Sequence, residues 1–152
     1  MIVTFCGHST FSPKPTDEAR MIKILEDISK ETPITFYLGG YGDFDHFAKR
    51  CAENYKKKYP ESKLVFVTPY LGKWLDDRRD YIKQYDETVY PDIETVPLKF
   101  AISKRNEWMV NEADYVIAYV QTHYGGAYNM LLYAHKHNKP YSNIYDGKYE
   151  LI

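Results

Sequence analysis

Short apolar runs alternate with longer segments of helical periodicity along most of this sequence. The runs are five or six residues long and rich in branched and aromatic side chains, as in strands covered on both faces. They lie at 2–6, 34–38, 63–68, 115–120 and 141–145. Between them, apolar residues recur every three or four positions, which predicts helices at 16–30, 43–59, 98–112 and 127–137.

This alternation predicts an α/β fold, a Rossmann-like doubly wound domain with a mainly parallel sheet of about five strands and helices on both faces. Right-handed crossovers and the usual doubly wound arrangement give the strand order 3-2-1-4-5. The carboxyl ends of strands one, two and four then meet at the switch point, where such sheets bind ligands.

Residues 1–152 are expected to form a single domain, since this length suffices for one hydrophobic core. The segment 69–97 interrupts the alternation, because a polar stretch at 74–83 is followed by a proline-punctuated one. We interpret it as a long crossover with little core of its own, which could act as a lid.

Charge and composition narrow the class of partner. The net charge of −1 gives no general attraction to nucleic acid or to an anionic membrane, so we expect neither as a partner. No apolar run approaches the ~20 residues that cross a bilayer.

The cysteines and histidines indicate the compartment and the absence of a metal site. Cys6 and Cys51 have no CxxC partner, which is typical of a reducing compartment, so a cytoplasmic location is expected. The histidines lack metal-ligand spacing, so we expect no metal site and no required cofactor.

The turn after the second apolar run combines glycines with acids. Gly39, Gly40 and Gly42 lead into Asp43 and Asp45 at the start of the predicted helix. Glycine lets the main chain approach a ligand closely, but the acids already occupy the place where a phosphate would bind. The turn is therefore either a tight turn with an N-cap, or the acidic side of a pocket that accepts hydrogen bonds from a ribose or a base edge.

A second strand–glycine–helix turn contains Thr122, His123, Gly125, Gly126 and Asn129, and it carries no acid. Backbone N–H groups at a helix N-terminus, supported by a hydroxyl, an imidazole and an amide, favour a phosphate. This turn is the better candidate for a phosphate site. The alternative is that the two glycines only connect the strand to the helix.

Arg105 lies beside the apolar stripe of its predicted helix, next to Asn106. A guanidinium near a core needs an anionic partner. That partner is either a ligand phosphate or a structural acid such as Glu112 or Asp114.

The turn after the first strand adds Gly7, His8 and Ser9 to the candidate ligand-binding residues. Because strands one, two and four end at the same edge, we expect this turn, residues 39–45 and residues 121–129 to converge. Convergence of three polar turns is stronger evidence for a ligand site than either glycine turn alone.

Four motifs in this order resemble the SLOG superfamily, which includes the lonely-guy phosphoribohydrolases and the DprA-like Rossmann proteins. They are Cys6–Thr10, Leu38–Asp45, Lys104–Val110 and Gly125–Asn129. Within this superfamily, the sequence is most similar to an uncharacterised bacterial or phage branch, and the resemblance covers nearly the whole chain. The resemblance implies a Rossmann-like fold that binds a nucleotide or nucleotide-derived ligand, often as a homodimer.

The lonely-guy enzymes cleave the N-glycosidic bond of a nucleoside monophosphate with an arginine and a glycine turn that is followed by a catalytic glutamate. Arg105, Gly125 and Gly126 match these features, but Leu132 stands at the position of the glutamate. Leucine cannot act as a general acid or base. The lonely-guy activity is therefore not carried over unless another carboxylate supplies the missing role.

Two functions follow from these residues. The first is binding or sensing of a nucleotide or nucleotide-derived small molecule at the C-terminal edge of the sheet. The alternative is an N-glycosidic-bond hydrolase or transferase acting on a nucleoside monophosphate, with Arg105, Asp43 and Asp45 as catalytic residues. A DNA-associated role, by analogy with DprA, is disfavoured by the near-neutral charge and the lack of a basic stripe.

Overall fold

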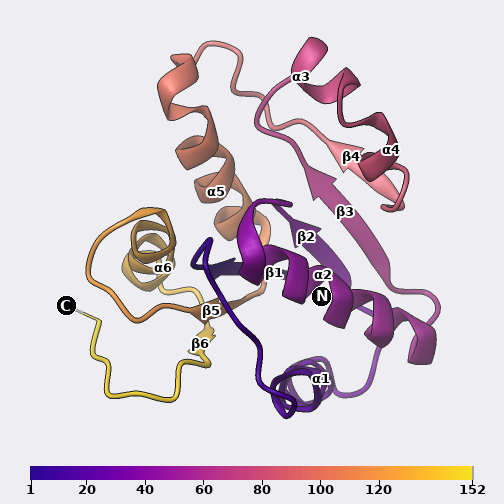
Figure 1. Ribbon diagram of the computed structural model, residues 1–152, viewed down its shortest axis with the longest axis vertical. Coiled ribbons are helices and arrows are strands. Elements are labelled where there is room, and N and C mark those ends of the chain that lie inside the picture. Colours follow the sequence, from indigo (N-terminus) through magenta and orange to yellow (C-terminus); the bar gives the residue numbers. More distant parts are fainter. Residues whose placement is uncertain (152) are drawn as a thin grey trace.

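The computed structural model describes residues 1–151, which form one parallel sheet with helices on both faces (Figure 1). The sheet has six strands in the order β4-β3-β2-β1-β5-β6. The strands are β1 (Ile2–Gly7), β2 (Thr35–Leu38), β3 (Lys63–Val67), β4 (Glu87–Val89), β5 (Tyr115–Tyr119) and β6 (Tyr141–Asn143). The predicted α/β class and the parallel sheet are confirmed.

The prediction of five strands missed β4. This strand pairs in parallel with the outer edge of β3, with Val65 opposite Glu87 and Val67 opposite Val89. Two of its three residues are exposed, so it has no apolar run by which it could be recognised. The other five strands keep the predicted order, with β1 in the centre between β2 and β5.

The four long helices lie close to the predicted ranges. They are α1 (Asp17–Ser29), α2 (Gly42–Lys58), α5 (Ala101–Glu112) and α6 (Gly126–Lys136). The polar stretch at 74–83 forms two short helices, α3 (Lys73–Asp76) and α4 (Arg79–Ile82), and a 3-10 turn (Leu98–Phe100) precedes α5. Among the described residues, no helix is long and apolar enough to cross a membrane.

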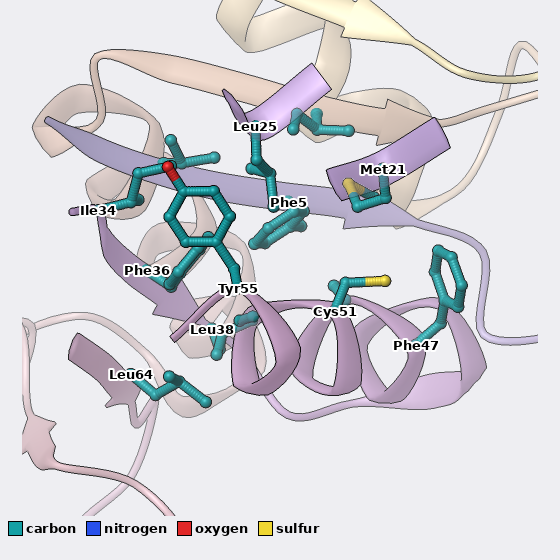
Figure 2. Packing of buried hydrophobic residues seen from close by; sticks show 14 of the residues in the cluster. Phe5, Met21, Leu25, Ile34, Phe36, Leu38, Phe47, Cys51, Tyr55 and Leu64 are labelled. Carbon is teal, nitrogen blue, oxygen red and sulfur yellow. The ribbon is translucent and has the colours of Figure 1, made fainter. Parts of the chain in front are cut away.

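One face of the sheet is covered by α1 and α2 (Figure 2). Aromatic and aliphatic side chains of β1, β2 and β3 pack there against both helices; they include Phe5, Phe36, Leu38, Leu64, Met21, Leu25, Phe47, Cys51 and Tyr55. All nine are at most 3% exposed. Full burial of a large apolar side chain contributes about 1.5–3 kcal/mol, so this layer is a main source of stability.

The opposite face is covered by α5 and α6, which pack on Cys6, Val65 and Ala118 through Met109 and Leu131. Side chains of a strand alternate between the two faces of a sheet, so Phe5 and Cys6 of β1 belong to different core layers. The strands are therefore buried on both sides, as their continuous apolar runs predict.

The crossover at 69–97 packs against the sheet instead of projecting from it. Trp74, Leu75, Tyr81 and Ile82 contact the core layer under α1 and α2, and Tyr85 is buried. The segment thus shares the core of the sheet and adds β4 to its edge. Its movement as a lid stays a prediction.

Candidate functional site

A hollow of about 500 Å³ lies at the carboxyl edge of the sheet, beyond β1 and β5. The turn after β1, the start of α2, one face of α5 and the turn into α6 surround it. The lining residues are Phe5–Thr10, Tyr41, Asp45, Ile102, Arg105, Asn106, Met109, Gln121, Thr122, Tyr124–Ala127 and Met130. Residues from all three turns that were expected to converge meet here.

Arg105 forms part of the floor and is only 3% exposed. Its Nη1 donates hydrogen bonds to the carbonyl oxygens of Val67 (2.7 Å) and Gly39 (3.3 Å), and its Nε donates to Asn106 Oδ1 (3.0 Å). The guanidinium therefore closes the carboxyl ends of β2 and β3. The expected structural acid Asp114 instead accepts a hydrogen bond from the N–H of Ile2 at 2.7 Å.

The second terminal nitrogen of Arg105, Nη2, faces the hollow. No residue of the described chain accepts a hydrogen bond from it, whereas every buried polar side-chain atom in that part of the chain has a partner. Nη2 must therefore be accessible, and the hollow is the space that Arg105 lines. Burial lowers the pKa of Arg105, with the Asp45 carboxylate acting in the opposite direction. An arginine nevertheless keeps its charge, so the floor presents a fixed cation.

Asp45 borders the same space. Its Oδ2 accepts a hydrogen bond from the N–H of Tyr41 at 3.0 Å. A Cβ added at Gly39 would lie 3.2 Å from Arg105 Nη2 and 3.3 Å from Asp45 Oδ2, so Gly39 separates the two charged groups. Burial raises the pKa of Asp45 to about 6, while the Tyr41 N–H and Arg105 favour the ionised form.

The N-terminus of α2 is closed by the loop after β1. The N–H of Asp43 donates to Ser9 O at 2.9 Å, and Asp43 Oδ2 accepts from the N–H of Phe11 at 3.1 Å. Gly42 has a φ of 86°, and a Cβ there would lie 2.7 Å from Ser9 Cα. Asp43 is thus a structural residue outside the hollow, and its predicted catalytic role has no support in its position.

Two further glycines of the prediction serve close packing. A Cβ at Gly7 would lie 2.2 Å from the ring of Phe44, and one at Gly40 would lie 2.7 Å from the ring of Phe66. Gly7 still lines the hollow, whereas Gly40 does not.

The N-terminus of α6 is open. A Cβ at Gly125 or Gly126 would meet no atom of the described residues within 4 Å. Among the described residues, no side chain at the N-cap position bonds to this helix, and its first turn contains no acid. Thr122, Gly125 and Gly126 line the hollow, as predicted for a phosphate site.

His123 and Asn129 lie outside the hollow, contrary to their predicted roles as ligand contacts. A ring nitrogen of His123 is hydrogen-bonded to Glu150 O at 2.6 Å, and its ring stacks on Tyr149 with centroids 4.8 Å apart. Tyr149 also donates to Thr122 O at 2.7 Å. The C-terminal segment therefore holds the turn before α6 from outside.

His8 joins two walls of the hollow. Its Nε2 accepts a hydrogen bond from the N–H of Gln121 at 3.0 Å, so the ring proton is on Nδ1. Burial lowers the pKa of His8, which keeps the imidazole neutral at pH 7. Ser9, beside it, lines the hollow and is exposed.

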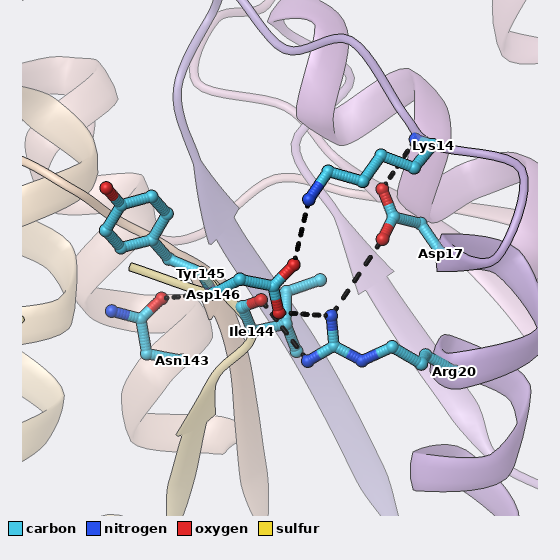
Figure 3. A network of polar contacts seen from close by, with 7 residues as sticks. All are labelled: Lys14, Asp17, Arg20, Asn143, Ile144, Tyr145 and Asp146. Atoms are coloured by element: carbon cyan, nitrogen blue, oxygen red, sulfur yellow. Dashed lines mark hydrogen bonds and ion pairs between the residues drawn. The ribbon is translucent and has the colours of Figure 1, made fainter. Parts of the chain in front are cut away.

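The loop after β1 is also tied to the C-terminal segment (Figure 3). Asp146 pairs with Lys14 at 3.0 Å and with Arg20 at 2.9 Å, and Arg20 donates to Ile144 O at 3.4 Å. These side chains are largely exposed, so each ion pair contributes little to stability. They position the outer side of the loop whose inner side closes α2.

Tyr41 and Tyr124 are the functional candidates that the sequence did not single out. They line the hollow from opposite turns and are 70% and 76% exposed. Both lie inside the predicted turns, but the high tyrosine content hides them among tyrosines that pack. Their exposure distinguishes them from the packed tyrosines, and exposure becomes known only from the folded structure. The described part of the chain contains no cluster of three His, Cys, Asp or Glu side chains that could hold a metal ion.

No protein-family model matches the sequence. The chain is 27% identical over 135 residues to the uncharacterized SPbeta prophage-derived protein YoqJ of Bacillus subtilis (strain 168), covering 77% of this chain and 79% of YoqJ.

Two solved structures share the fold, and both are DNA processing protein A (DprA). The one from Helicobacter pylori, described for its single-stranded DNA binding mode, has a TM-score of 0.59 at 17% identity. The one from Streptococcus pneumoniae has a TM-score of 0.63 at 18% identity. They cover 93% and 95% of this chain, which spans only 63% and 51% of theirs. The predicted resemblance to a DprA-like Rossmann fold of the SLOG group is confirmed at the level of the fold.

The same comparisons correct the predicted function and partners. The expectation was a small-molecule nucleotide ligand, with an N-glycosidic-bond enzyme as the alternative and nucleic acid as an unlikely partner. It is contradicted, because both structural neighbours are DNA processing proteins and the one from Helicobacter pylori is described for its single-stranded DNA binding mode. Net charge misled the prediction because it averages over the whole chain. A local site that combines a cation with aromatic rings can therefore exist in a chain of near-neutral net charge.

Proposed function

We propose that this protein binds single-stranded DNA at the hollow beyond β1 and β5. The observation that carries the proposal is a hollow of about 500 Å³ that combines a buried, partly unpaired guanidinium with two highly exposed tyrosines. The DprA-like fold supports the choice of ligand. Exposed aromatic rings beside a cavity are typical of single-strand binding, where each base stacked on an aromatic ring contributes about 1–3 kcal/mol.

Each part of the hollow has a role in this proposal. One nucleotide occupies the cavity, whose volume lies within the range of roughly 300–1,000 Å³ that is usual for small ligands. Tyr41 and Tyr124 stack on the neighbouring bases. A phosphate lies over Gly125 and Gly126, where the dipole of α6 favours an anion and no side chain competes for the backbone N–H groups.

Fluorescence anisotropy with a labelled 20-nucleotide single strand tests the proposal. We expect saturable binding, weaker binding of the matching duplex, and no change with a metal chelator. Tyr41→Ala and Tyr124→Ala should each weaken binding by about tenfold, which corresponds to ~1.4 kcal/mol. Tyr133→Ala, near the far end of α6, is the control and should bind like the unaltered protein. No binding to any single strand, or no loss in both variants, would refute the proposal.

A cytoplasmic location and a homodimer belong to the same proposal. Cys6 and Cys51 are free and buried, as in a reducing compartment, and the resemblance to the SLOG group implies a dimer. Light scattering of the purified protein measures the oligomeric state directly, and a monomer at all concentrations would contradict the dimer.

A further inference from the structure

The floor of the hollow places a hydrogen-bond donor beside an acceptor. Arg105 Nη2 and Asp45 Oδ2 both lie within about 3.3 Å of the position that a Cβ of Gly39 would take. Both residues line the hollow, and no ion pair within 4 Å joins them in the described chain. Each therefore has hydrogen-bonding capacity left for a ligand.

Both groups are held in place by the main chain. Nη1 of Arg105 is bound to the carbonyl oxygens that follow β2 and β3, and Nε is bound to Asn106. Asp45 Oδ2 is bound to the N–H of Tyr41. These bonds fix the plane of the guanidinium and the position of the carboxylate before a ligand arrives. A preorganised donor–acceptor pair discriminates between ligands more strongly than mobile side chains do.

The four DNA bases differ in how they match this pair. The Watson–Crick edge of guanine carries one acceptor, O6, followed by two donors, N1–H and the 2-amino group. Adenine can place N1 against the guanidinium and its 6-amino group against the carboxylate, and cytosine can place N3 and its 4-amino group in the same way. Each then offers the carboxylate only one donor, where guanine offers two. Thymine has an acceptor and one donor, but its second carbonyl oxygen would face the carboxylate. An ionised carboxylate only accepts hydrogen bonds and a guanidinium only donates them, so guanine fits best.

We propose that Arg105 and Asp45 select guanine for the hollow, with O6 accepting from Arg105 and the N1–H and 2-amino groups donating to Asp45. This inference rests on the proposed binding of single-stranded DNA and names the base that the site prefers. Asp45 is then a specificity-determining residue that contacts the base, and not a catalytic residue. An arginine that donates to O6 of guanine is also the commonest specific base contact in protein–DNA complexes.

The protonation of Asp45 supplies an independent readout. The charged and titratable groups around it are Arg105 of α5, His8 and Cys6 of β1 and its turn, and Tyr81 and Tyr85 of the crossover. His8 is neutral at pH 7, and burial raises the pKa of the thiol and of both phenols, so only Arg105 and Asp45 are charged there. Because the pKa of Asp45 is about 6, the carboxylate is ionised at pH 8 and largely protonated at pH 5. The preference for guanine should therefore fall as the pH is lowered from 8 to 5.

The test uses 15-nucleotide oligo(dT) strands that carry one central dG, deoxyinosine, dA, dC or dT, competed against a labelled strand. We expect the dG strand to bind about tenfold more tightly than the dT strand, within the range of good base contacts. Deoxyinosine, which lacks the 2-amino group, should be intermediate. In Asp45→Asn the dG/dT ratio should fall to about 1 and lose its pH dependence. The matched control Asp43→Asn changes a carboxylate outside the hollow and should keep the ratio.

The outcomes separate the two proposals. If no strand binds, the proposed function fails. If all strands bind equally, or if Asp45→Asn retains the preference for dG, single-strand binding stands and the selection of guanine by Asp45 is refuted. Melting curves of both variants, recorded at the assay temperature and above, ensure that only folded protein is compared.

Discussion

Both α2 and α6 begin at a glycine turn that follows a strand of the central sheet, but only α6 begins in open space. At α2, the N–H of Asp43 is bonded to Ser9 O, and a side chain at Gly42 would collide with the main chain of Ser9. At α6, a side chain at Gly125 or Gly126 would touch no described atom within 4 Å. The same local design therefore completes the fold at one helix and leaves open space at the other, where we propose that a phosphate binds.

The difference comes from the loop that follows β1. Phe11 packs against Phe47 and Tyr119 with ring centroids 5.2 and 4.7 Å apart, which draws this loop over the start of α2. The turn before α6 has no such cover, and it is held by Tyr149 and Glu150 from outside and by His8 at Gln121. Whether a glycine turn is closed or open thus depends on the segment that packs beside it.

Gly42→Ala tests the closed turn and should have the largest effect. The substitution combines a positive φ with a contact of 2.7 Å to main chain, so we expect the free energy of unfolding to fall by about 3 kcal/mol. Urea denaturation followed by circular dichroism measures it. A loss below about 1 kcal/mol would show that the loop after β1 can move away from α2 at little cost.

Asp45→Asn tests whether the buried carboxylate of Asp45, beside the closed turn, lowers the stability of the protein. Burial raises the pKa of Asp45 from 3.8 to about 6, so the folded protein favours the protonated acid. The stability that Asp45 contributes is therefore present below pH 4 and is lost as the pH rises through 6. The variant should be more stable by about 1–2 kcal/mol at pH 7 and unchanged at pH 4. Equal stability of the two proteins at both pH values would contradict this account.

Gly126→Ala tests the open turn. Because a Cβ there meets no described atom, the free energy of unfolding should stay within about 0.5 kcal/mol of the original. Single-strand binding should weaken about fivefold, since the methyl group covers N–H groups proposed to hold a phosphate. Anisotropy and urea denaturation together distinguish these effects. A large loss of stability with intact binding would reverse the roles assigned to the two turns.

Asp146→Asn tests the ion pairs on the outer side of the loop after β1 and should have the smallest effect. Its ion pairs with Lys14 and Arg20 are exposed, so the loss of stability in urea denaturation should be smaller than for any variant above that is destabilised, and it should vanish in 1 M salt. A larger loss would mean that the loop is fixed from outside, and not by Phe11 and Asp43.

The periodicity of the sequence predicts the four long helices and five strands because each buries an apolar face. It fails for β4, where Glu87 and Thr88 are held in the sheet by pairing with β3 alone. The same limit applies to the site. Strand order predicts that three turns meet, and they do. No local sequence pattern shows, however, that the carboxylate of Asp43 accepts a hydrogen bond from the N–H of Phe11, or that His123 is hydrogen-bonded to Glu150 O.

Arg105 shows both what could be predicted and what could not. Its place beside the apolar stripe of α5 predicts a buried guanidinium that needs partners. The partners are main-chain oxygens of Gly39 and Val67, which any residue at those positions would provide. No side-chain pattern in a sequence can therefore identify them.

The pairing of β1 also has a consequence for how the chain acquires its site during synthesis. The N–H of Gln121 reaches His8 across 113 residues, and Ile2 reaches Asp114 across 112. On the ribosome, the central strand must wait for most of the chain before its second neighbour emerges, and such distant pairing is slow to form. A nascent chain that stops short of β5 would carry the closed turn but would lack the turn into α6 that completes the hollow. The proposed DNA binding would thus be gained late, after the first core layer has formed.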